Sequence, residues 1–249
     1  MSGHSKWSTI KRQKGANDAK RGAMFTKVAR EIMVAARAGG GDPDANYRLR
    51  LAMDKARSIN MPADNIKRAI ERATGAGEGE QYEEIVYEGY GPGGVAVLVE
   101  AATDNRNRTA AEVRSIFSKT GGQLAGSGAV AWQFEARGLI TVAREGVDPD
   151  EVALAAIDAG ASDVFNDAAT TEIYTEPADL EAVRKALDAA GVAVEDAENA
   201  MIAKQTTAVD ADHVRKVMRL IDLLEDLDDV QRVTSNAEIP EELMEELAG

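Results

Sequence analysis

The sequence predicts an α+β fold: an N-terminal three-helix bundle followed by two α/β sandwich domains, the third ferredoxin-like and inserted into the second. Three observations support this prediction. The apolar residues repeat with a helical period from residue 23 to about residue 75, and stretches with a strand period first occur beyond it. A strand-helix-strand pattern then occurs twice between residues 139 and 204. A further helix and strand follow the repeat and supply what the preceding layer lacks.

Three amphipathic patterns predict the bundle. The first helix is expected over residues 23–38. The second is expected to begin with Asp42 as its N-cap and Pro43 at its first helical position. The third is expected to begin at Pro62 and to end at Gly75. Because Lys and Arg occupy the polar positions of these patterns, the bundle is predicted to have basic outer faces.

The apolar period changes after a glycine-rich linker at residues 75–79. Strands are expected over residues 84–90, 95–103 and 129–134. Thr109 and Glu112 have the spacing of a capping box, which predicts that a helix opens at Thr109. Residues 79–136 are therefore expected to contain strands and one helix, but no second helix to cover their sheet.

The helical stretch at residues 150–160 resembles the stretch at residues 179–191, and strand patterns flank both. Such a repeat can close as a ferredoxin-like sandwich of its own. The helical pattern over residues 214–227 then supplies the missing cover for the earlier strands. The predicted division is an arm at 1–22, a bundle at 23–78, a discontinuous domain at 79–137 plus 205–249, and an inserted acidic domain at 138–204.

Composition narrows the class of protein. The chain has 249 residues, which is enough for two or three domains, and 44% of them are hydrophobic. It has no cysteine, which excludes disulfides, thiolate metal sites and cysteine catalysis and fits a reducing compartment. We find neither a signal peptide nor an apolar run of about 18 residues. We therefore expect a cytoplasmic protein with no membrane partner.

The net charge of −14 is unevenly distributed along the chain. Residues 1–74 hold 16 Lys and Arg against 7 Asp and Glu, a net charge of +9. Residues 75–249 hold 13 against 36, a net charge of −23. An acidic body repels nucleic acid while a basic segment attracts it, so we expect local, salt-sensitive binding near the N-terminus. The alternative for the acidic body is that its charge serves solubility alone.

The arm is basic, polar and nearly free of carboxylates. It shows no apolar repeat and carries one aromatic residue, Trp7. Spaced cations neutralise phosphates and an indole stacks on a base, so the arm is predicted to bind nucleic acid. The alternative is a solubilising chain end. The residues expected to make these contacts are His4, Lys6, Trp7, Lys11, Arg12, Lys14, Lys20, Arg21 and, just beyond the arm, Lys27.

The sequence offers little material for catalysis. His4 and His213 are the only histidines and lie in different modules without a thiol, so a metal site or a serine-type triad is not expected. The glycine clusters match no phosphate-loop or dinucleotide motif. The acidic run at residues 222–229 has carboxylates that suit magnesium, but it fits the solvated end of an amphipathic helix better. We predict no enzyme activity, no metal and no cofactor.

One turn between a buried strand and a helix start combines amides, cations and free backbone N–H groups. It consists of Asn105, Arg106, Asn107 and Arg108. Such a turn can bind an anion. A plain capping turn held by its asparagines is an equal alternative.

Several stretches of the sequence resemble the YebC/PmpR family, which includes the mitochondrial translational activator of cytochrome oxidase subunit one. They are GHSKW at residues 3–7, IKRQK at 10–14, KVAREI at 27–32, NMPADNIKRAI at 60–70, YEGYGPGG at 87–94 and TDNRNRT at 103–109. The resemblance implies a cytoplasmic three-domain protein without catalytic activity, whose arm contacts nucleic acid. Members are described as DNA-binding transcriptional regulators and as ribosome-associated translation factors that relieve stalling at proline runs.

The sequence thus predicts a non-enzymatic, nucleic-acid-binding regulator of gene expression, with a DNA-binding transcriptional regulator as the first expectation. The alternative is a translation factor that binds ribosomal RNA through the arm. Physical reasoning leans to RNA, because a duplex reader needs a rigid element that presents side chains to base edges. A helix-turn-helix in the bundle and a protein adaptor working through the acidic domains are weaker alternatives. The sequence does not set the oligomeric state.

Overall fold

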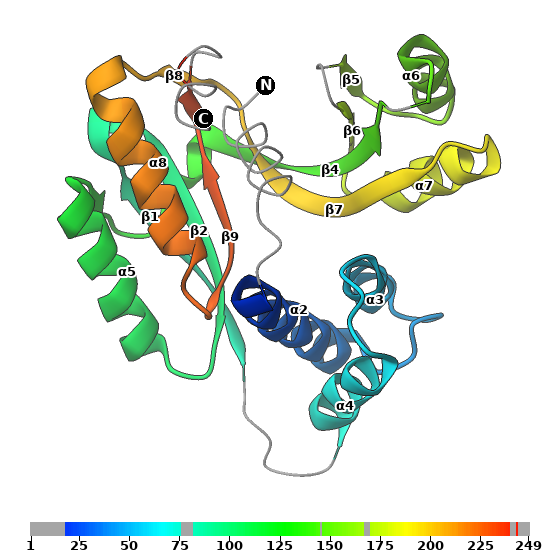
Figure 1. Ribbon diagram of the computed structural model, residues 1–249, viewed down its shortest axis with the longest axis horizontal. Helices are drawn as coiled ribbons and strands as arrows, with labels where there is room; N and C mark the ends of the chain where they lie inside the picture. Colours follow the sequence, from blue (N-terminus) through cyan, green and yellow to red (C-terminus); the bar gives the residue numbers. More distant parts are fainter. Residues whose placement is uncertain (1–17, 76–81, 145, 167–169, 240–242, 244–249) are drawn as a thin grey trace. The chain divides into compact units, whose positions relative to one another are not determined.

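The computed structural model describes residues 18–75, 82–144, 146–166, 170–239 and 243, with side chains from Gly22 onward. The chain forms two compact units that divide between Phe134 and Glu135 and again between Ile202 and Ala203. Helices come first and antiparallel sheets follow, which confirms the predicted α+β class (Figure 1). In the described part of the chain, no helix is long and apolar enough to cross a membrane.

Three helices form the bundle of the first unit. They are α2 (Asp18–Gly39), α3 (Tyr47–Ser58) and α4 (Ala63–Thr74). Apolar side chains at helical spacing on each of them meet in one core, because burial of these stripes removes apolar surface from water. The buried members of this core include Val28, Ile32, Ala35, Leu49, Ala52, Ala56, Ile66 and Ala69.

The predicted start of the second helix is wrong, because Asn46 rather than Asp42 is its N-cap. The Asn46 Oδ1 accepts a hydrogen bond from the Leu49 backbone N–H at 3.1 Å. Its Nδ2 donates to the carbonyl oxygens of Ala35 and Gly40, each at 2.8 Å. The buried amide thus satisfies the end of α2 and the start of α3 together. A carboxylate lacks the N–H donors for this double role.

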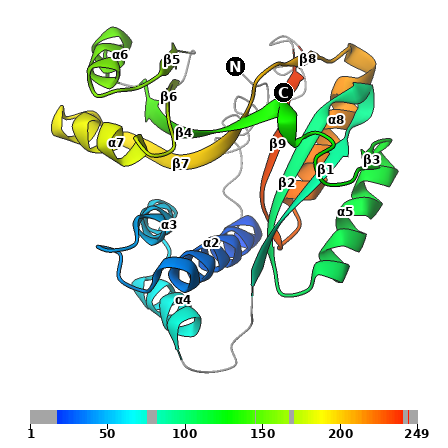
Figure 2. The same cartoon turned by 180° about the vertical axis from the view of Figure 1, so that it is seen from behind.

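A four-stranded antiparallel sheet in the order β3-β1-β2-β9 forms the α/β part of the first unit. Its strands are β1 (Glu83–Tyr90), β2 (Ala96–Thr103), β3 (Gln123–Leu124) and β9 (Val230–Ser235). Two helices, α5 (Arg106–Thr120) and α8 (Ala211–Glu225), lie in front of this sheet in Figure 1 and behind it in Figure 2. The helix that follows the inserted segment therefore completes the layer, as predicted.

Two short helical turns and a small strand pair complete this part. The turns are η1 (Pro92–Gly94) and η2 (Ala131–Gln133), and β8 (Thr207–Ala208) pairs in parallel with β10 (Ala237–Glu238). The strand predicted over residues 129–134 is wrong, since a bend and then η2 occupy residues 129–133. The backbone N–H groups of Val130 and Ala131 bond to the carboxylate of Glu88 and do not join a strand ladder.

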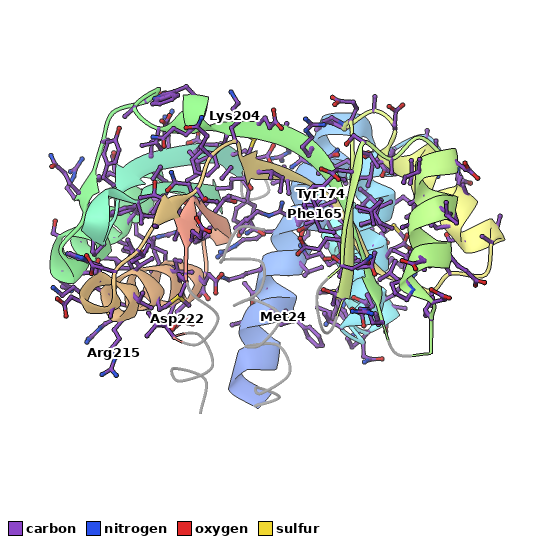
Figure 3. The ribbon with its side chains drawn as sticks, turned by 90° about the horizontal axis from the view of Figure 1, so that it is seen from above. Met24, Phe165, Tyr174, Lys204, Arg215 and Asp222 are labelled. Carbon is purple, nitrogen blue, oxygen red and sulfur yellow. The ribbon has the colours of Figure 1, made fainter. Side chains whose placement is uncertain are left out.

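The second unit has the ferredoxin-like layout that the repeat predicts. Its elements are β4 (Phe134–Ala143), α6 (Pro149–Asp158), β5 (Asp163–Asn166), β6 (Thr170–Thr175), α7 (Leu180–Ala189) and β7 (Val194–Ala203). The sheet order is β5-β6-β4-β7, with the first and third strands adjacent in the centre. Phe165 and Tyr174 pack edge to face on neighbouring strands, with ring centroids 5.6 Å apart (Figure 3).

Candidate nucleic-acid interface

Most of the side chains predicted to bind nucleic acid lie outside the described part of the chain. These are His4, Lys6, Trp7, Lys11, Arg12 and Lys14, together with the side chains of Lys20 and Arg21, whose backbone opens α2. Lys27 is described and is half-buried on α2. The contacts around Lys27 show how α2 is held against the residues at the end of α8.

Two cations of α2 contact the end of α8 and the turn that follows it. The Nζ of Lys27 donates to the carbonyl oxygen of Glu225, and the guanidinium of Arg30 donates to that of Asp228. The last carbonyls of a helix have no partner within the helix and carry a partial negative charge, so cations stabilise them. Lys27 therefore takes part in a contact within the protein.

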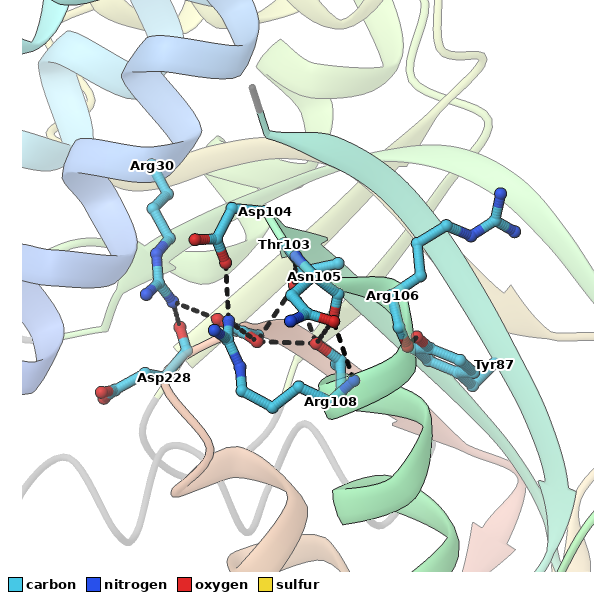
Figure 4. A network of polar contacts seen from close by, with 10 residues as sticks. Arg30, Tyr87, Thr103, Asp104, Asn105, Arg106, Arg108 and Asp228 are labelled. Carbon is cyan, nitrogen blue, oxygen red and sulfur yellow. Dashed lines mark hydrogen bonds and ion pairs between the residues drawn. The ribbon is translucent and has the colours of Figure 1, made fainter. Parts of the chain in front are cut away.

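A buried carboxylate continues the same contact. Asp229 is 3% exposed, and its Oδ1 forms an ion pair with Arg30 at 3.0 Å (Figure 4). Its Oδ2 accepts hydrogen bonds from the Thr109 hydroxyl at 2.6 Å, Arg108 at 2.7 Å and the Thr103 hydroxyl at 3.1 Å. Asp229 therefore joins α2 of the bundle to the end of β2 and the start of α5.

The environment of Asp229 determines its charge state. Burial acts to raise its pKa, because a charged group loses hydration. Hydrogen bonds from Thr109, Arg108 and Thr103 and the charge of Arg30 outweigh burial, so the pKa of Asp229 is lowered. The group stays ionised, and the contact between bundle and sheet is a charged one.

The turn predicted as an anion site caps α5. Asn105 is its N-cap, and the Asn105 Oδ1 accepts from the Arg108 backbone N–H at 3.1 Å. The helix thus begins before Thr109, so the capping box predicted at Thr109 is wrong. Thr109 lies inside α5 with its buried hydroxyl on Asp229. The asparagine supplies the first acceptor because it leaves the strand in an extended conformation, as N-caps do.

The two arginines of this turn already face carboxylates. Arg108 contacts Asp104 and Asp229, each at 2.7 Å (Figure 4). Arg106 lies 3.6 Å from Glu83. An incoming anion would have to compete with these groups. Anion binding by the turn stays a prediction, and its geometry favours a capping role.

The outer faces of the bundle are basic. On α4, Lys67, Arg68 and Arg72 are exposed, and the last two are one helical turn apart on the same face. Lys67 has Glu71 at 3.7 Å, a distance at which an exposed pair is weak. The helix therefore presents positive charge to solvent.

Comparison with known proteins identifies the family of the chain. Residues 5–76 match the family model described as the TACO1/YebC protein N-terminal domain, and residues 82–237 match the TACO1/YebC second and third domain. The chain belongs to the TACO1/YebC family. The predicted family is thereby confirmed, and the turn and the bundle described above both lie inside the matched regions.

Relatives cover the full length of this TACO1/YebC chain. A "probable transcriptional regulatory protein" of Desulfotalea psychrophila is 56% identical over 249 residues and is covered completely, as is this chain. One of Roseiflexus castenholzii is 57% identical over 251 residues, covering 99% of this chain and 98% of the relative. A crystal structure of a conserved hypothetical protein from Aquifex aeolicus has 48% identity and a TM-score of 0.86, covering 90% of this chain and 93% of that one.

Other groups singled out in the TACO1/YebC sequence have structural partners. His213 lies in the first turn of α8 with its Nδ1 2.8 Å from the N-cap carboxylate of Asp210. Among the described residues, no three His, Cys, Asp or Glu side chains are grouped as a metal site would require. The acidic run that ends α8 includes Asp229, whose carboxylate faces Arg30 and Arg108.

Sequence reasoning did not find Arg30, Asp229 or Glu88 as organising residues. Arg30 and Asp228 are 198 positions apart, and Glu88 reaches N–H groups about 40 positions away. Periodicity reports only local neighbours, so it carries no signal for such contacts. The charge excess of the N-terminal part was the one usable clue that its cations need acidic partners.

Proposed function

We propose that this protein is a non-enzymatic regulator of gene expression that binds nucleic acid through its arm (1–22) and bundle (23–78). The observation that carries the proposal is the contrast between the net +9 of residues 1–74 and the net −23 of the rest. The family membership supports it, because relatives bear the name probable transcriptional regulatory protein. Duplex DNA is therefore the first target to test.

Electrostatics favours contact through the N-terminal part. Each cation that meets a phosphate releases condensed counterions, which gives sequence-independent affinity. Exposed Arg68 and Arg72 on α4 extend the positive surface beyond the arm. The discontinuous domain (79–137 plus 205–249) and the inserted domain (138–204) carry most carboxylates and repel the same polymer. Charge-driven binding is then concentrated in the N-terminal part, and the acidic domains orient the protein or meet a partner.

The composition of the arm favours a second target, ribosomal RNA. Its cations alternate with small residues and one aromatic, Trp7, a pattern that suits phosphates and unpaired bases rather than base edges in a duplex groove. On this reading the protein is a ribosome-associated translation factor. The two targets separate experimentally, because promoter-length DNA competes for binding in the first case and not in the second.

The test is the salt dependence of binding to a fluorescent duplex and to purified ribosomes. Replacing Lys11, Arg12 and Lys14 with alanine should weaken binding and reduce the slope of log affinity against log salt by about 0.7 to 0.9 for each lost phosphate contact. The matched control removes three exposed cations of the α/β part, Arg114, Lys119 and Lys216. It has the same change in net charge and should leave the slope unchanged. Equal slopes for the arm variant and the unmodified protein would contradict the proposal.

A further inference from the structure

Trp132 is the most exposed large apolar side chain of the described residues. Its exposed fraction is 67%, in a chain with only two tryptophans and 4% aromatic residues. A large indole in water forgoes the stabilisation of burial. A second exposed ring, hydrogen-bonded to the same Ala129 carbonyl, makes the two rings a candidate contact surface for a ligand or partner. The neighbouring strand β1 ends in Tyr90, which is 39% exposed.

The loop that presents Trp132 is held by a buried carboxylate. Glu88, 5% exposed, accepts backbone hydrogen bonds from Gly128 at 2.6 Å, Val130 at 2.7 Å and Ala131 at 2.8 Å. Burial acts to raise its pKa, but these N–H groups outweigh burial and lower the pKa, so the carboxylate stays ionised. The loop is thus fixed from beneath by three charge-assisted hydrogen bonds.

The two aromatic side chains are oriented by a single carbonyl. The Ala129 oxygen accepts from the Tyr90 hydroxyl at 3.0 Å and from the Trp132 Nε1 at 3.1 Å. The polar ends of both rings are therefore satisfied within the protein, while much of their apolar surface stays exposed. Lys204, labelled in Figure 3, donates from its Nζ to the Trp132 carbonyl oxygen at 2.9 Å.

We propose that Trp132 and Tyr90 form a platform on which an unpaired nucleobase stacks, with Lys204 beside it for the adjoining phosphate. The inference rests on the proposed nucleic-acid-binding function and adds a contact outside the basic N-terminal part. Planar rings suit a base of any identity, and the ammonium of Lys204 has further protons to donate. The platform selects unpaired strands, because a base inside a duplex has no free face.

The surroundings favour a nucleobase over an apolar peptide. The residues before Ala129 are Gly126, Ser127 and Gly128, all exposed, and they add no apolar side chain around the rings. A protein partner would need a wider apolar patch rimmed by polar groups. Small residues instead leave room for a sugar-phosphate backbone to approach the rings.

The experiment uses the fluorescence of Trp132 in the full chain. Trp7→Phe leaves Trp132 as the only tryptophan. This protein is titrated with single strands of about 12 adenylate nucleotides, as RNA and as DNA, and with a duplex of the same length. We expect the single strands to quench Trp132 emission and the duplex not to do so. A difference in quenching between the RNA strand and the DNA strand identifies which of the two the site prefers.

Affinity measurements complete the test. In the natural background, Trp132→Ala should weaken single-strand binding about tenfold, which corresponds to about 1.4 kcal/mol for a stacked base, and Trp132→Phe should retain most of the affinity. Leu154→Ala, at an exposed apolar residue of the inserted domain, is the matched control and should change nothing. Circular dichroism melting of each variant establishes that its fold is kept.

The outcomes separate the two proposals. In one outcome the intact protein binds strands and the variant with Lys11, Arg12 and Lys14 replaced binds weakly, but Trp132→Ala binds as tightly as the unmodified protein and strands do not quench Trp132 emission in the Trp7→Phe protein. The platform is then refuted and the proposed function stands. If no nucleic acid binds at all, both are refuted. Quenching by an apolar peptide but not by strands would also overturn the platform, since it would make the site a protein contact.

Discussion

The first 74 residues and the rest of the chain use their charged side chains differently. In the basic part, Arg68 and Arg72 face solvent on α4, whereas Lys27 and Arg30 are turned toward the end of α8. In the acidic part, many carboxylates are exposed, but Asp229 and Glu88 are buried and fully engaged. The sign of a region therefore does not define its role. A few charged side chains hold the fold together, and solvent-facing ones such as Arg68 and Arg72 can meet a partner.

The largest expected effect tests whether the acidic part holds the basic part. Asp229→Ala removes the buried carboxylate that Arg30 and the hydroxyls of Thr103 and Thr109 contact, so we expect a loss of about 3 kcal/mol in the free energy of unfolding. Urea denaturation measures it. Asp228→Ala is the control, because its exposed side chain is not the group that Arg30 contacts, and it should cost under about 0.5 kcal/mol. Equal costs would show that the charge pair is unimportant.

The next effect concerns the carboxylate beneath the Trp132 loop. Glu88→Gln keeps the shape but places an amide N–H₂ against backbone donors, so we expect a loss of about 2 kcal/mol at neutral pH. Glu112→Gln, at an exposed position of α5, should be neutral. Comparing the two variants separates a carboxylate that holds the fold together from one that is solvated. A neutral Glu88→Gln would place Glu88 among the solvated ones.

Acid should abolish the difference between Glu88 and glutamine. The pKa of Glu88 is lower in the folded protein than its ordinary value of about 4.3, so the stabilisation is complete above that value and falls as pH drops toward the folded pKa. We expect the gap in unfolding free energy between the unmodified protein and Glu88→Gln to be widest near pH 7 and to narrow below about pH 4. A gap that is constant over this range would mean that Glu88 is not bound as a carboxylate.

A smaller effect distinguishes a cap from an anion site. Asn105→Ala removes the N-cap of α5 and should cost about 1 kcal/mol, while Asn107→Ala, exposed in the first turn, should cost little. Thermal unfolding measures both variants. Neither variant should change the salt slope of nucleic-acid binding. A reduced slope for Asn107→Ala would instead support the predicted anion-binding turn.

The smallest effect is expected for the exposed ion pair that joins the basic bundle to the acidic sheet. Arg48 of α3 contacts Glu84 of β1, with one hydrogen bond of 2.9 Å, and both side chains are about half exposed. Exposed pairs contribute about 0.2 to 1 kcal/mol, so Glu84→Ala should lower the unfolding free energy by less than Asp229→Ala does. A double-mutant cycle with Arg48→Ala isolates the pair. A larger coupling than that of Arg30 and Asp229 would reverse the assignment of the main contact.

The sequence was sufficient for most of the fold because local patterns specify it. The helical period located the three bundle helices, and the strand period located β1 and β2. Caps were harder, since Asp42 and Thr109 carry the same kinds of acceptor as Asn46 and Asn105. The choice between them depends on which side chain also meets buried groups elsewhere, as Asn46 does with Ala35.

The candidate site was predictable only as far as charge and composition reach. They pointed to the arm and the basic bundle, while the contacts that hold α2 join residues far apart in the chain. The strand expected over residues 129–134 failed for the same reason, because Glu88 on β1 accepts hydrogen bonds from the N–H groups of Val130 and Ala131. An alternating apolar pattern cannot report a distant buried acceptor.

The most direct test of the central claim compares the intact protein with one that begins at residue 18. Both are sedimented with ribosomes over a salt series, with promoter-length DNA as competitor and as a separate ligand, and their melting temperatures are measured alongside. The account predicts that the shortened protein melts as the intact one does but loses most of its salt-dependent nucleic-acid binding. Undiminished binding by the folded, shortened protein would contradict the assignment of the arm.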